Sequence, residues 1–173
     1  VWKQEAGEVP VGFNRGPWSG RMLGGDGMIL HFATPSYTVG TKGVQRGHVL
    51  KEPVTQAEFE RIKGKLKGAW VLIGGKNEGY PIDWTEKGDS IRNEIISRNA
   101  EIERQNREAM IHHRSIRDMS EKDRKKNGLS EKEIRPYEYE PGLFYRQMVE
   151  AGILGIIQAS EVPIRALYDR KNL

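Results

Sequence analysis

The sequence predicts an α/β fold in which short buried strands pack against helices and a long helical insertion separates two of the strands. Two short apolar runs, 69–73 and 153–158, each have the length and composition of a buried strand. A helical segment leads directly into the second run through Ala151 and Gly152, where the glycine suits a helix end. Between the two runs, the segment of about 77–140 has many charged residues, and its apolar residues recur at helical spacing. These three observations predict one core, interrupted by a polar insertion.

Composition sets limits on the class of protein. The 173 residues suit a single domain, 1–173, that is long enough to bury a core, and 36% apolar with 30% charged residues fits a globular domain that carries a polar segment. The net charge is +4, but 24 acidic residues are interspersed among 28 basic ones, so we do not expect a nucleic-acid partner. The absence of cysteine excludes disulfides, thiol catalysis and cysteine zinc sites. No apolar run reaches the roughly 18 residues of a membrane span.

The first third of the chain reads as turns and short strands. Residues 1–27 are rich in Gly, Pro and aromatic residues, which indicates loops. Residues 28–32 form an apolar run that predicts a strand. Residues 44–51 have a mixed apolar pattern, so we expect an edge strand, which ends before Pro53.

A capping box marks the first helix. The Thr55 hydroxyl is placed to accept a hydrogen bond from the Glu58 amide, and the Glu58 carboxylate to accept one from the Thr55 amide. The helix is predicted over 56–63 and ends at Gly64. The strand that follows, 69–73, is apolar on both faces, so we expect it to be central and buried.

A long helix is predicted from an N-cap at Asp89 or Ser90 to about Arg117. Its apolar stripe repeats every seven residues, with Ile91 and Met110 nearby, and consists of Ile95, Ile102, Ala109 and Ile116. This stripe has three possible partners: the body of the domain, the short helical piece at 120–127, or a second copy of the chain, of which the last is the least favoured.

The remaining elements follow from local signals. The predicted pieces are a polar helix at 120–127 ended by Gly128, a capping box at 130–133, an extended stretch at 137–140, a helix over 141–151, the strand 153–158 and a last strand fragment at 166–168. The strands 69–73 and 153–158 are predicted to be neighbours in one sheet.

In their order along the chain, these motifs resemble the protease-associated (PA) domain. The carriers of the resemblance are Lys65-Leu66-Lys67-Gly68 before the first apolar strand, the helix 144–151, and the Gly-containing strand after it. The stretches 39–44 and 55–59 resemble more specifically the PA segments of bacterial zinc aminopeptidases related to glutamate carboxypeptidase and the transferrin receptor. The resemblance covers roughly 28–75 and 141–160. The long insertion departs from the family pattern.

The resemblance implies a swivelling β/β/α core with small mixed sheets, barrel-like, flanked by helices. It also implies a non-catalytic accessory domain that acts as a lid, gates substrates or contacts proteins, in an exported (periplasmic or extracellular) peptidase. The partner would be the catalytic domain of the same parent chain, with peptide substrate as a second contact. Zinc would belong to that catalytic domain, and no cofactor or metal is expected in this segment. The start at Val1, without Met, is expected of a processed protein or a fragment.

The residues show no convincing catalytic constellation. Adjacent His112 and His113 point about 100° apart on a helix, which disfavours a shared metal. The glycines at 24–27 and 74–75 lack the P-loop pattern. Aromatic residues in loops are candidate contacts to a partner or a substrate, namely Trp18, Tyr80 and Trp84. The alternative to the PA hypothesis is a free-standing binding module whose basic helical arm contacts an acidic partner or nucleic acid.

Overall fold

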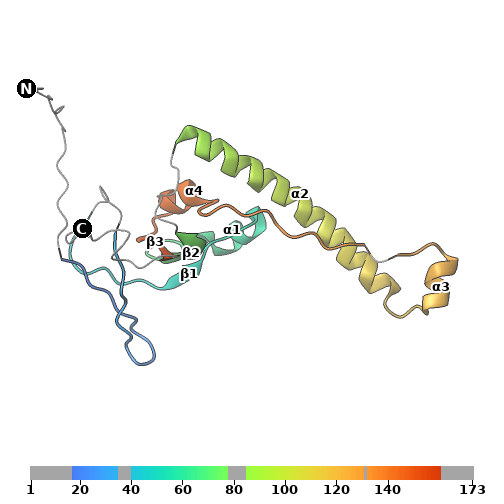
Figure 1. The fold of residues 1–173 in the computed structure, drawn as a ribbon, viewed down its shortest axis with the longest axis horizontal. Coiled ribbons are helices and arrows are strands. Elements are labelled where there is room, and N and C mark those ends of the chain that lie inside the picture. The colour runs from blue at the N-terminus through green and yellow to red at the C-terminus, as the bar shows by residue number, and fades with distance from the viewer. Residues whose placement is uncertain (1–16, 35–39, 78–84, 131, 161–173) are drawn as a thin grey trace, which may run out of the picture.

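The computed structural model shows a mixed α/β fold built on a small parallel sheet (Figure 1). It describes residues 17–34, 40–77, 85–130 and 132–160. The elements, in chain order, are β1 (Val49–Lys51), α1 (Gln56–Ile62), a 3-10 turn (Lys63–Lys65), β2 (Trp70–Asn77), α2 (Glu86–Ile116), α3 (Glu121–Lys126), α4 (Tyr145–Glu150) and β3 (Gly155–Ser160).

The predicted pairing of the two apolar strands is confirmed. The sheet order is β1-β2-β3, and β2 pairs in parallel with β3 from Trp70 opposite Gly155 to Asn77 opposite Ser160. β1 is an edge strand and β2 is central, as the sequence predicts. In the described residues this one parallel sheet differs from the small mixed sheets that the resemblance implies.

One face of the sheet carries the core. Inward residues of the strands pack with Phe59 of α1, Ile95 of α2, Met148 of α4 and Phe144, the N-cap of α4. Both crossovers run in the same direction across the sheet, so the right-handed rule places their helices on one face.

The opposite face of the sheet is mainly apolar and is partly exposed to solvent. We call it the open face, and its residues are Val49, Lys51, Trp70, Leu72 and Ile157. Val49 is 53% exposed and Leu72 43%. The prediction that both faces of the central strand are buried is therefore wrong. Sequence alternation alone does not distinguish a covered apolar face from an open one.

Several local predictions are corrected. Residues 28–32 form no strand, and Ile29 only bridges to Arg21 in a short hairpin. Of the predicted strand 44–51, only Val49–Lys51 is formed. The 130–133 capping box opens no helix in its described residues, and residues 132–140 form no helix or strand. The fragment 166–168 lies outside the described residues.

The caps differ from the sequence pattern in detail. Thr55 accepts from the Glu58 amide at 3.2 Å as predicted, but the Glu58 carboxylate accepts from Val54 N–H at 2.8 Å and not from Thr55. The long helix begins three residues before Asp89, with Thr85 as its N-cap. Asp89 is instead held by ion pairs.

The predicted stripe of α2 is buried, at Ile95, Ile102, Ala109 and Ile116, whereas Ile91 and Met110 are exposed. Ile95 packs into the core. Farther out, the face that bears the stripe is lined by residues 132–140, which we call the return segment and which runs back along α2 (Figure 1). The helical piece at 120–127 forms α3, at the far end of α2 (Figure 1). We call α2, α3 and the return segment the arm.

Three side chains of α2 hold the backbone of the return segment at regular intervals. Asn99 donates to the carbonyl of Glu138 and accepts from its N–H, each at 2.7 Å. Asn106 makes the same pair of bonds to Arg135, each at 2.8 Å. His113 Nε2 donates to the Lys132 carbonyl at 2.7 Å. Each step is seven residues on the helix and three on the return segment.

The two step lengths match. Seven helical residues rise about 10.5 Å, and three residues of extended or polyproline-like chain span about 9–10 Å. The same interval therefore repeats without loss of register. A contact at every third residue is the period of polyproline II, which Pro136 favours.

Candidate functional site

Among the described residues, the most strongly buried ionisable side chain is that of Glu52, directly after β1. Glu52 is 3% exposed, and its N–H continues the ladder to the Leu72 carbonyl at 3.0 Å. The carboxyl ends of the parallel strands lie here, which is the edge where ligands bind in open α/β sheets. A ligand site would therefore be expected at this edge.

Three donors from three segments converge on this carboxylate. Gly74 N–H donates to Oε1 at 2.6 Å, and Gly142 N–H donates to Oε2 at 2.9 Å. The Tyr139 hydroxyl also donates to Oε1. Glu52 thus joins the sheet, the return segment and the turn before α4.

The backbone around Glu52 requires glycine. The register of β2 against β3 shifts between Ile73 and Lys76, and Gly75 in this bulge has φ 68°. A Cβ on Gly74 would come within 2.8 Å of the Tyr139 hydroxyl oxygen. The Gly74-Gly75 pair therefore allows β2 to pass close beneath the return segment.

Burial raises the pKa of Glu52, and the hydrogen bonds from Tyr139, Gly74 and Gly142 and the charge of Lys51 oppose this rise. Burial and the neighbouring Glu52 carboxylate raise the pKa of Tyr139 as well. The carboxylate oxygens of Glu52 are already used within the protein, so the arrangement is that of a structural latch.

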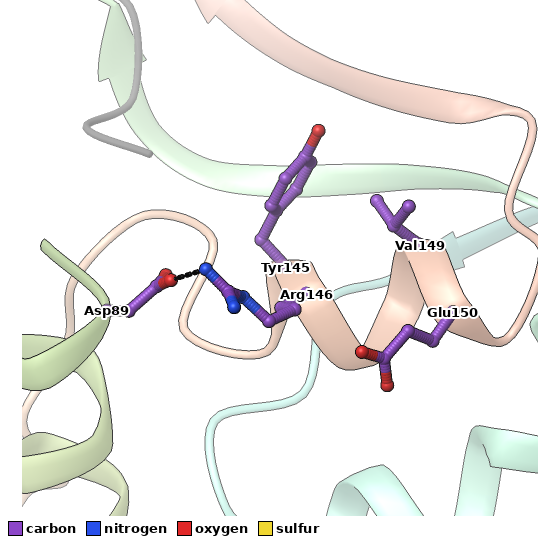
Figure 2. A pocket seen from close by; sticks show the side chains of 5 residues that line it. All are labelled: Asp89, Tyr145, Arg146, Val149 and Glu150. Atoms are coloured by element: carbon purple, nitrogen blue, oxygen red, sulfur yellow. Dashed lines mark hydrogen bonds and ion pairs between the residues drawn. The ribbon is translucent and has the colours of Figure 1, made fainter. Parts of the chain in front are cut away.

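The described surface has a shallow cavity of about 360 Å³ between the start of α2 and α4 (Figure 2). It is lined by Asp89, Tyr145, Arg146, Val149 and Glu150. In Figure 2 the Arg146 guanidinium points at the Asp89 carboxylate, with which it forms an ion pair.

Asp89 is also paired on its other side. The buried Arg92 donates to it at 2.5 Å, and this hydrogen bond is the main cause of a lowered pKa at Asp89, to which the charge of Arg146 adds. Because Asp89 neutralises Arg146, the cavity offers little net attraction to an anionic ligand. The pair instead fixes α4 to the first turn of α2.

Of the aromatic residues predicted as contacts, Trp18 lies within the described residues. Trp18 is partly exposed, and its indole N–H donates to the Phe32 carbonyl at 2.7 Å. Tyr80 and Trp84 lie outside the described residues. His112 and His113 bind the carbonyls of Ser130 and Lys132. No group of three or more metal-ligating side chains occurs within the described residues.

Sequence reasoning missed Glu52, Tyr139 and the two asparagines of α2. For Asn99 and Asn106 a signal existed: they recur with the heptad of the isoleucine stripe, on the same face. For Glu52 and Tyr139, 87 residues apart, no local pattern marks the contact.

No helix of the described part is both long and apolar enough to cross a bilayer. Comparison of the chain with models of protein families, with curated proteins and with solved structures gave no match.

Proposed function

We propose that this chain is a non-catalytic accessory domain of the PA type, carried by an exported zinc-dependent aminopeptidase, where it gates the access of peptides to the catalytic domain. The observation that carries the proposal is the parallel pairing of β2 with β3, two strands that the arm separates in the sequence. The helix α4 and the glycine turn at Gly152 feed β3 in the order of the PA motifs.

The open face supports an accessory role. An exposed apolar surface on a sheet marks a site of contact with another protein body. Val49, Leu72 and Ile157 lie on this face, and the Trp70 ring covers Gly155, where an added Cβ would come within 2.8 Å of the indole. A neighbouring domain of the same parent chain would cover this surface.

The states of the ionisable groups also favour a non-catalytic role. The carboxylates of Glu52 and Asp89 have shifted pKa values, and both are engaged by hydrogen bonds from several segments of the fold. Catalytic acids and bases need a free position next to substrate. Here the shifts accompany structural contacts.

The first experiment measures hydrolysis of aminoacyl p-nitroanilides by the purified chain with added zinc. We expect none. Hydrolysis that stays with the chain through further purification, and that chelators abolish, would contradict the proposal.

The second experiment uses the longer parent protein that the proposal requires. The double variant Leu72→Glu/Ile157→Glu should change the ratio of kcat/KM between long peptides and aminoacyl anilides, because it disturbs the contact with the catalytic domain. The exposed Ile91→Glu on α2 is the matched control. A parent without zinc-dependent aminopeptidase activity, or an unchanged ratio, would refute the assignment.

A further inference from the structure

The net charge of the chain is concentrated on the far half of the arm. Residues 104–135 hold ten of the 28 Lys and Arg residues and six of the 24 Asp and Glu residues. Their net charge is +4, which equals the net charge of the whole chain, so the remainder is neutral. The arm projects away from the sheet and carries this charge with it (Figure 1).

On α2, two neighbouring apolar side chains are exposed within this basic region. Met110 is 59% exposed and Ile111 62%. Arg107 and Arg114 lie three or four residues from them on the same side of α2, and both are exposed. We call these four residues the tip face.

The two arginines of the tip face make few ion pairs with the rest of the described chain. Arg107 approaches Glu103 only at 3.8 Å, and Arg114 has no ion pair among the described residues. Arg104 differs, because Glu101 and Glu108 both bind it at 2.6 Å. The tip face therefore offers positive charge around an apolar centre.

We propose that the tip face is a docking surface for an acidic polypeptide segment that presents apolar side chains to Met110 and Ile111 and carboxylates to Arg107 and Arg114. This inference does not depend on the proposed function. The ladder of Asn99 and Asn106 supports the arm along its length, so the surface is presented on a preformed helix.

Other occupants fit less well. A phosphate backbone would meet Glu108, Asp118 and Glu121 among the basic residues, and residues 104–135 have no Phe, Tyr or Trp on which a base would stack. A second copy would bring the same positive charge to the contact. A membrane-surface helix needs a longer apolar face than two residues.

The test measures fluorescence anisotropy of a labelled amphipathic peptide in which Glu and Asp flank Leu residues at helical spacing. The intact chain should bind it, more weakly as salt rises. Arg107→Glu/Arg114→Glu and, separately, Met110→Ser/Ile111→Ser should each weaken binding by about tenfold or more. The control Arg61→Glu/Lys87→Glu makes the same change in charge at exposed sites outside the tip face and should bind as the wild type does.

Circular dichroism of each variant verifies the fold, since all substituted side chains are exposed. A labelled DNA strand, a DNA duplex and phosphatidylserine vesicles serve as competing probes. The proposal is overturned if the acidic peptide does not bind, if the tip variants bind as tightly as the control, or if DNA or vesicles bind in preference to the peptide.

Discussion

The rings of Phe59 and Phe144 stack with their centroids 5.1 Å apart and an angle of 8° between their planes. Phe59 comes from α1, between the first two strands, and Phe144 precedes α4, after the arm. The contact therefore closes the core over the sheet from both crossovers. Both rings are buried.

Phe144→Ala should lower the free energy of unfolding by about 3–5 kcal/mol, because it removes a fully buried ring and leaves a cavity. Urea unfolding followed by far-UV circular dichroism measures this. Val149→Ala, at an exposed position of α4, is the control and should change the free energy by less than about 1 kcal/mol. Equal effects of the two substitutions would show that the aromatic pair does not organise the core.

Asn99→Ala should cost about 1–3 kcal/mol in the free energy of unfolding, since Asn99 is 0% exposed and its removal takes away hydrogen bonds to part-buried backbone groups of Glu138 and Val54. The amide of Glu138 should lose protection from hydrogen exchange. Asn93→Ala, exposed on the same helix, is the control. A Glu138 amide that stays protected in Asn99→Ala would contradict the ladder.

Glu52 should make the chain relatively more stable in mild acid. Its folded-state pKa is raised above the ordinary 4.5, so the folded state binds the proton more tightly than the unfolded state. This contribution is complete below the unfolded pKa and is lost as pH rises through the folded pKa.

The measurement is the difference in unfolding free energy between the wild type and Glu52→Gln as pH is lowered from 7. Gln does not titrate, so the difference isolates Glu52 from carboxylates with lowered pKa values, such as Asp89. As pH falls, the unfolding free energy of the wild type should increase relative to that of the variant, by at most about 1.4 kcal/mol per pH unit. A gain in the opposite direction would show that hydrogen bonding outweighs burial.

Gly74→Ala should destabilise the chain by about 1–3 kcal/mol, because the new methyl group overlaps the Tyr139 hydroxyl against Glu52. Thermal unfolding measures the loss. Gly24→Ala is the control, since a Cβ there has no neighbour within 4 Å. If the two alanine variants have the same melting temperature, β2 and the return segment have room for a methyl group between them, which contradicts the close approach at Gly74.

The sequence predicted the parts of the fold that local chemistry determines. Apolar runs located β2 and β3, and the seven-residue stripe located the buried face of α2. The failures have a common cause. The N-cap at Thr85, the open face beside Leu72 and the latch at Glu52 each depend on what a distant segment contacts or leaves exposed.

The predicted contact residues show the same limit. Trp18 is tied to Phe32 by a hydrogen bond that no sequence pattern indicates, and Tyr80 and Trp84 lie outside the described residues. The asparagines of α2 could have been predicted to face inward from their spacing. Their partner could not, because the two asparagines bind backbone groups of the return segment, which any residue type provides.

The ladder between α2 and the return segment gives the arm a unit of length. Seven residues of helix and three residues of return segment separate Asn99 from Asn106 and Glu138 from Arg135. Deleting seven helical residues and three residues of the return segment together would leave each remaining side chain of the ladder opposite its backbone partner. Deleting only one of the two would shift the register between α2 and the return segment. The insertion can thus be shortened or extended in paired steps, and the distance from sheet to tip becomes adjustable without any change to the core.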